Sequence, residues 1–227
     1  MVFPLSLIVM LSCLPWLGWA EALSLEEIVD RVQKKYEGTQ GFTADFEQTT
    51  RLAAFKKEQV SSGKVFMKKP GRMRWEYQSP EKQLIVSDGD TLWIYNASLH
   101  QVIENKLSKA YDSKTPGLFL TGMGKLTEDF QVRFSPDLPQ ALGGGTPSGA
   151  GPYTLELSPK DPQLQQNLSR LVITVNPKDY LVEKSVAYDP LGNVTALHFS
   201  NIRVNVGLPL SLFKFQVPKG AERIKVP

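Results

Sequence analysis

Alternating apolar and polar residues run through much of this chain and are clearest between residues 63 and 96. In this stretch, Met73, Trp75 and Tyr77 alternate with charged residues. A repeat of two residues places these three side chains on the same face of a β-strand. A Pro-Gly and an Asp-Gly dipeptide interrupt the alternation, and Asp-Gly between β-rich runs favours a tight hairpin turn. The pattern therefore predicts a meander of four strands.

Similar alternating or apolar runs occur before and after the meander, separated by turn-forming residues. The further predicted strands cover residues 42–46, 101–103, 130–134, 153–157, 171–175, 181–188, 194–199, 202–206 and 213–217. The polar stretch from Lys56 to Ser62 is interpreted as a connection that leads into the meander. With roughly ten to twelve short strands and almost no long helix, the predicted fold is mainly β, a large antiparallel sheet curled into a barrel or half-barrel.

One amphipathic helix is predicted ahead of the strands. Ser24 and Glu27 have the spacing of a capping box, in which each side chain satisfies a backbone N–H of the other residue. Apolar residues with helical spacing follow at Leu25, Ile28, Val29, Val32 and Tyr36. Gly38 then provides a stop signal. Since an apolar stripe needs a partner surface, we expect this helix to cover the mouth of the curled sheet.

Residues 1–20 carry no charge and are almost entirely apolar. Small residues fit cleavage near Ala20 or Ala22, so we expect a cleaved signal peptide followed by a single domain over residues 21–227. A transmembrane anchor is the competing interpretation, although Pro4 and Pro15 fit a cleaved segment better. Within the domain, residues 135–152 are rich in glycine and proline, and a flexible loop is predicted there.

Composition and charge narrow the function classes. The single cysteine, Cys13, lies inside the predicted signal peptide, so we expect neither a disulfide nor a thiol nucleophile in the mature chain. The 26 basic and 23 acidic residues give a net charge of +3 without a long run of like charge, which disfavours nucleic-acid binding. His100 and His198 belong to no metal-spaced cluster, and the common hydrolase and nucleotide motifs are absent. We therefore expect no enzymatic activity, no metal and no cofactor.

The large side chains of Met73, Trp75 and Tyr77 on one strand face have two interpretations. Aromatic residues at strand spacing usually fill a core. Alternatively, deformable and amphipathic side chains of this kind line a cavity that accepts ligands of varied shape. The alternation by itself does not decide between a packed core and a lined cavity.

Four segments together carry a family pattern. They are FTADFEQ at residues 42–48, KVFMKKPGRMRWEY at 64–77, LIVSDGDTLWIYN at 84–96 and FKFQVPKG at 213–220. This pattern resembles the LolA family of outer-membrane lipoprotein carriers, and the resemblance covers most of the chain after the predicted signal peptide. It implies an incomplete, half-open β-barrel with a helical lid over a hydrophobic cavity, in a periplasmic protein that we expect to be a monomer.

The resemblance also assigns candidate roles to particular residues. The candidate lipid-binding cavity comprises Met73, Trp75, Tyr77, Leu92, Ile94, Val32, Tyr36, Leu118 and Phe119. Trp93 and Tyr95 are the alternative to Leu92 and Ile94, because both faces of that strand are apolar. The family commonly has an arginine that hydrogen-bonds the lid backbone just before the proline of the turn, and here Lys69 occupies that place. Lys69 is therefore the candidate lid latch, with the charge of arginine but without its planar fork of donors.

As a member of this family, the chain would take acylated lipoproteins from an inner-membrane lipoprotein-releasing ABC transporter to an outer-membrane lipoprotein acceptor. An apolar cavity does not distinguish an acylated protein from a free lipid or glycolipid, so a carrier of another membrane lipid is one alternative. A lipid-binding envelope receptor or sensor on the same fold is a second alternative. A third is lipid hydrolysis, for which the sequence offers no evident nucleophile and base.

Overall fold

The protein is described from a computed structural model over residues 23–55, 57–107, 125–135 and 151–225. Its strands are β1 (Gly41–Leu52), β2 (Lys57–Lys68), β3 (Arg72–Ser79), β4 (Gln83–Asp88), β5 (Thr91–Asn96), β6 (Gln101–Lys106), β7 (Phe130–Phe134), β8 (Tyr153–Pro159), β9 (Arg170–Val175), β10 (Val182–Tyr188), β11 (Val194–Val204) and β12 (Glu222–Lys225). The predicted signal peptide, most of the predicted loop at 135–152, and both Leu118 and Phe119 lie outside the described residues.

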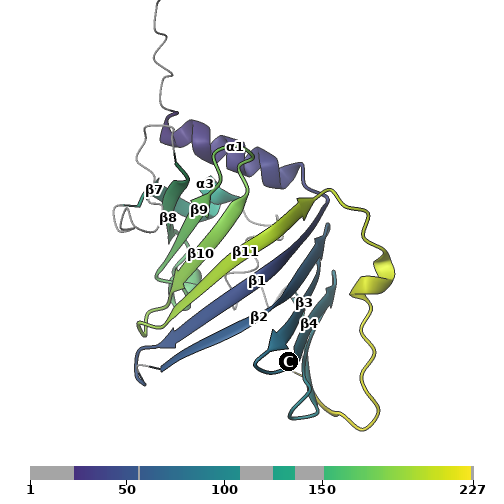
Figure 1. Ribbon diagram of the computed structural model, residues 1–227. Helices are drawn as coiled ribbons and strands as arrows, with labels where there is room; N and C mark the ends of the chain where they lie inside the picture. Colours follow the sequence, from purple (N-terminus) through teal and green to yellow (C-terminus); the bar gives the residue numbers. More distant parts are fainter. Residues whose placement is uncertain (1–22, 56, 108–124, 136–150, 226–227) are drawn as a thin grey trace, which may run out of the picture.

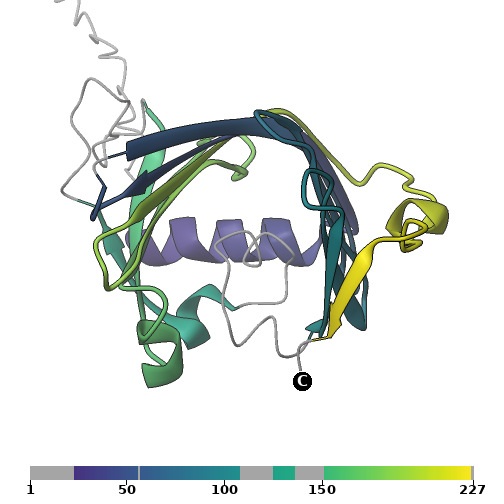
Figure 2. The same cartoon turned by 90° about the horizontal axis from the view of Figure 1, so that it is seen from below.

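These strands form one 12-stranded sheet in the order β12-β6-β5-β4-β3-β2-β1-β11-β10-β9-β8-β7. The neighbouring pairs are antiparallel, apart from the parallel pair of β12 and β6. The sheet curls strongly but does not close, since β12 and β7 lie at its two opposite edges (Figures 1 and 2). The half-open barrel predicted from the sequence is therefore confirmed.

Helix α1 (Leu25–Glu37) crosses the mouth of the half-barrel and spans the space between its two walls (Figures 1 and 2). The predicted capping box is present: Glu27 N donates to Ser24 Oγ at 3.2 Å, and Ser24 N donates to Glu27 Oε2 at 2.9 Å. Its predicted apolar stripe faces the sheet, where Ile28, Val29, Val32 and Tyr36 are buried. Because one wide apolar stripe contacts a concave sheet, the helix is held by packing and not by propensity alone.

The central meander forms as predicted from β2 to β5. At the first turn Gly71 has φ +62°, and at the Asp-Gly turn Gly89 has φ +112°, conformations that glycine adopts without a steric cost. The Asp88 carboxylate supports the second turn by accepting from the backbone N–H groups of Asp90 and Thr91 at 3.0 and 2.9 Å. In this part of the chain, the turn-forming residues and the alternating pattern therefore predict the same strands.

Three predicted details are wrong. Lys57–Ser62 is not a connection but the first half of β2, which pairs with β1 along its whole length. The two predicted strands at 194–199 and 202–206 are a single strand, β11, bent by an irregularity in its register opposite Thr43 to Asp45. The predicted strand at 213–217 does not form. In its place, a 3-10 turn (Leu210–Phe213) begins an irregular segment, and the last strand, β12, comes later.

This irregular C-terminal segment packs on the convex side of the meander. Phe213 is only 1% exposed, and the guanidinium of Arg74 on β3 donates to the Leu212 carbonyl at 3.3 Å. The ring of Phe215 lies 5.9 Å from that of Trp93. Apolar residues at 213–217 thus alternate because they cover a sheet face, although they do not belong to the sheet.

The short helices α3 (Leu126–Asp129) and α4 (Pro162–Gln165) flank the second wall of the half-barrel, which consists of β7–β11. One hydrophobic core fills the concave side, and it combines residues of α1 with residues of both walls. In the part of the chain that the structure describes, no helix is long and apolar enough to cross a membrane.

Candidate functional site

The strand register identifies which side chains point into the half-barrel. Trp75 pairs with Ile85, and Ile85 pairs with Ile94, so these three lie in one row across β3, β4 and β5. Because directly paired residues share a face of the sheet, Ile94 lies on the same concave face as Trp75. The alternating residues Trp93 and Tyr95 lie on the convex face, where both rings are near Phe215. The sequence alone had not decided whether Leu92 and Ile94 or Trp93 and Tyr95 face the concave side.

Aromatic rings form the centre of the concave face. The ring of Phe46 lies 5.0 Å from those of both Trp75 and Tyr77 in edge-to-face arrangements. Trp75 also approaches Phe199 on β11, with ring centroids 6.3 Å apart. Such contacts add about 0.5–1.5 kcal/mol per pair to the free energy of area burial. Phe46 and Phe199 were not among the candidate residues, although the alternation around each of them was a usable signal.

Helix α1 contacts both walls of the half-barrel through polar groups as well as through its apolar stripe. On one side, the backbone N–H of Val182 donates to the hydroxyl of Tyr36 at 3.0 Å, and Arg31 donates to the hydroxyl of Tyr180 at 2.6 Å. Burial raises the pKa of Tyr36 well above its usual range, so this phenol remains neutral. The helix is thereby tied to the start of β10.

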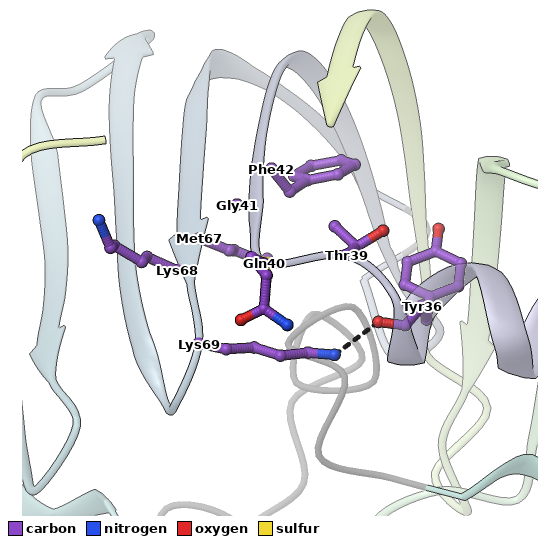
Figure 3. Close-up of a pocket in the computed structure, with 8 residues that line it drawn as sticks. All are labelled: Tyr36, Thr39, Gln40, Gly41, Phe42, Met67, Lys68 and Lys69. Carbon is purple, nitrogen blue, oxygen red and sulfur yellow. Dashed lines mark hydrogen bonds between the residues drawn. The ribbon is translucent and has the colours of Figure 1, made fainter. Parts of the chain in front are cut away.

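On the other side, Lys69 reaches the C-terminal end of α1 (Figure 3). Its ammonium donates to the carbonyl oxygens of Tyr36 at 2.6 Å and Glu37 at 2.9 Å. Both carbonyls belong to the last helical turn, where the helix dipole also favours a cation. Partial burial lowers the pKa of Lys69, and the nearby Glu37 carboxylate opposes that shift. A small pocket of about 10 Å³ lies beside this contact, lined by Phe42 and Met67 among others.

Most of the candidate cavity residues gather in one place. Met73, Trp75, Leu92, Val32 and Tyr36 are buried members of the same core cluster, and Tyr77 and Ile94 pack against it half-buried. Lys69 lines the small pocket together with Tyr36, Phe42 and Met67, which belong to this cluster. Leu118 and Phe119 lie outside the described residues.

Two larger pockets border the cluster. A pocket of about 410 Å³ lies between α1, α3 and β7, with Val29, Phe130 and Val132 among its lining residues. A second pocket, of about 230 Å³, lies at the end of the meander away from α1 and is mostly polar. No group of His, Cys, Asp and Glu side chains suited to hold a metal occurs within the described ranges.

Comparisons with known proteins agree with this arrangement. The family model described as "Outer membrane lipoprotein carrier protein LolA" matches residues 37–216. An outer-membrane lipoprotein carrier protein from Methylococcus capsulatus is 30% identical over 213 residues, which cover 93% of this chain and 95% of the relative. A protein of the same description from Cupriavidus pinatubonensis is 32% identical over 205 residues, with 89% of both chains covered. These relatives are named as carriers and not as enzymes.

A solved structure, of an uncharacterised conserved protein from Thermus thermophilus, shares the fold. It has a TM-score of 0.53 and 16% sequence identity, and the match covers 90% of this chain and 100% of that one. Because the family model spans most of the chain, including the strands that form the concave face, this protein belongs to the LolA family of outer membrane lipoprotein carrier proteins.

Proposed function

We propose that this protein is a periplasmic carrier that holds the acyl chains of lipoproteins on the concave face of its sheet, beneath α1. In this role it receives acylated lipoproteins from an inner-membrane lipoprotein-releasing ABC transporter and delivers them to an outer-membrane acceptor. The observation that carries the proposal is the position of α1. One amphipathic helix, tied to both walls, covers the apolar concave face of a protein that belongs to a carrier family.

The energetics of the helix support reversible loading. Exposing an acyl chain of roughly fifteen methylenes to water costs on the order of 12 kcal/mol, at about 0.8 kcal/mol per CH₂. The four buried side chains of the α1 stripe contribute roughly 6–12 kcal/mol by burial, at about 1.5–3 kcal/mol each. An acyl chain that replaces the helix stripe on the concave face therefore restores a burial energy of similar size. The exchange of the helix stripe for an acyl chain is therefore nearly balanced once that chain has left the membrane.

The lid arrangement also solves a problem of the empty carrier. A concave face with Phe46, Trp75 and Phe199 exposed would be a large apolar patch, and such patches promote aggregation. With α1 in place, Trp75 is only 6% exposed. Met73 and the aromatic rings suit the cargo, because deformable and flat side chains adapt to acyl chains of different shape.

The test is to purify the protein from its native periplasm and to identify bound molecules by mass spectrometry. We expect triacylated peptides in stoichiometric amount. Recovery of a single free lipid species would overturn the lipoprotein assignment and favour a lipid carrier. As a check against hydrolysis, a synthetic triacylated lipopeptide incubated with the protein should be recovered intact.

A further inference from the structure

The side chains of the concave face change from apolar to polar along the strands. Close to α1 its side chains are apolar, as with Trp75 on β3 and Ile94 on β5. One step further from the helix, Tyr77 follows on β3, and Asn96 follows on β5. The same step leads from Phe46 to Gln48 on β1. Neighbouring strands thus turn from apolar to polar at the same level.

This polar level belongs to a pocket of about 230 Å³ at the end of the half-barrel away from α1. We call its hydrogen-bonding side chains the polar rim. The polar rim consists of Gln48, Gln59, Ser61, Tyr77, Gln83 and Asn96. The register places several of them in direct sequence across the sheet, since Gln48 pairs with Ser61, Tyr77 with Gln83, and Gln83 with Asn96. Five adjacent strands therefore each contribute at least one neutral polar side chain.

Tyr77 marks the boundary between the apolar face and the polar rim. Its ring packs edge to face on Phe46 at 5.0 Å, while its hydroxyl donates to Gln48 Oε1 at 3.0 Å. Burial raises the pKa of Tyr77 to about 12, so the hydroxyl stays protonated at neutral pH. Ser185 lies in the same row, because it pairs with Leu197 and Leu197 pairs with Gln48. Its buried hydroxyl has no hydrogen-bond partner among the described residues.

The lining of this pocket has almost no charged side chains. Of the eight residues that line it, none is basic, and the single charged one is the acidic Glu81. The next position of β2 on the same face, Lys57, lies at the exposed tip of the strand. A phosphate group is normally bound by Arg or Lys side chains or by a helix N-terminus. The lining of this pocket supplies neither.

We propose that the polar rim binds the uncharged polar end of an acylated cysteine peptide, its ester and amide groups, and that it discriminates against anionic phospholipids. This inference rests on the proposed carrier function and specifies the cargo. Amide N–H groups and hydroxyls donate to ester and amide carbonyls, and amide oxygens accept from peptide N–H groups. A phosphodiester in the same place would lie beside Glu81 without a cation, and like-charge contacts of this kind oppose binding.

The experiment compares two ligands of equal acyl length on the mature protein. One is an S-diacylglyceryl cysteinyl peptide with an acetylated N-terminus, uncharged side chains and an amidated C-terminus, and the other is phosphatidylglycerol with the same two acyl chains. Dipalmitoylglycerol, which has esters but no peptide, shows whether the esters suffice or the peptide amides add to binding. Retention of each lipid is measured by gel filtration and mass spectrometry at equal lipid concentration. We expect the lipopeptide to be retained at least about tenfold more strongly than phosphatidylglycerol.

The decisive variant is Gln83→Lys, which places a cation in the pocket. It should raise the retention of phosphatidylglycerol relative to the lipopeptide by at least about fivefold, as expected for one charge pair in a partly hydrated site. Gln78→Lys is the matched control, because Gln78 is exposed on the adjacent strand β3, next to Tyr77, and does not line the pocket. It should leave the ratio unchanged. Thermal unfolding of both variants checks that each is folded.

The outcomes separate the two proposals. Equal retention of both lipids by the wild type, or a preference for phosphatidylglycerol, overturns the polar rim and leaves a lipid-carrying function in place. An unchanged lipid ratio in folded Gln83→Lys also overturns the polar rim. If the wild type retains none of these acylated ligands, the proposed carrier function itself fails.

Discussion

The contact between Lys69 and the end of α1 provides the sharpest test of how the lid is held. In Lys69→Met the aliphatic stem is kept, but both hydrogen bonds to the helix carbonyls are lost. Hydrogen bonds to a charged group contribute about 1.5–3 kcal/mol. Desolvation of the ammonium, which lowers the pKa of Lys69, offsets part of this hydrogen-bond contribution. We therefore expect the substitution to weaken the docking of α1 by about 1–2 kcal/mol, which is a factor of about 5–30 in the opening equilibrium.

Native-state hydrogen exchange measures this directly. The amides of residues 25–37 should exchange about 5–30-fold faster in Lys69→Met than in the wild type, while those of β8 and β9 in the second wall keep their rates. Lys69→Arg keeps the charge and adds a planar fork of donors, so its α1 amides should exchange no faster than in the wild type.

Lys68→Met is the matched control. Lys68 is the neighbouring lysine of the same strand end, but its ammonium donates to the Leu208 carbonyl at 2.5 Å, on the C-terminal segment. Its loss should leave the exchange of α1 unchanged. The reasoning is refuted if Lys69→Met leaves α1 exchange at the wild-type rate, or if Lys68→Met accelerates it equally.

Three further predictions concern stability. Because burial raises the pKa of Tyr77 to about 12 from 10.0, folding favours the neutral phenol, and its contribution is complete below pH 10 and lost as the pH rises through about 12. Urea unfolding should show that the wild type loses on the order of 3 kcal/mol more than Tyr77→Phe between these limits. Phe213→Ala should cost about 3–5 kcal/mol by urea unfolding, against less than about 0.5 kcal/mol for Leu210→Ala, because Phe213 is 1% exposed and Leu210 is 55% exposed. Gly63→Ala should lower the free energy of unfolding by about 1–3 kcal/mol, because the new Cβ would lie 1.9 Å from a carbonyl oxygen of β3, whereas Gly207→Ala meets no atom within 4 Å and should be nearly neutral.

The sequence correctly predicted those parts of the fold that depend on residues close together in the chain. The capping box of α1 and the Asp-Gly turn after β4 both formed as expected, because a few residues determine each of them. The stretch Lys57–Ser62 was misread since its strand is set by pairing with β1 and not by its own alternation. Residues 57–60 lie at the outer end of the half-barrel, where the side chains on both faces of the strand are exposed to solvent.

The C-terminal segment shows the opposite error. Phe213 and Phe215 alternate as strand residues do, but the structure uses them to cover the convex face of the meander. Periodicity reports that side chains are buried on one side, and it does not report which element buries them. For the candidate site, the inward face of β5 required the register, and the polar rim required five strands to be aligned.

The pairing of β1 with β11 has a consequence for how the chain matures. Apart from β12, which pairs with β6, the first wall consists of β1–β6 and the second of β7–β11, so each wall comes from one stretch of sequence. The pairing of β1 with β11 joins the two walls across some 150 residues. Until β11 has emerged, the first wall presents β1 as a bare edge with unpaired amides, which is a template for pairing with other chains. Completion of the sheet is therefore a late step of biogenesis, and a chain that ends before residue 194 is expected to associate with others instead of folding alone.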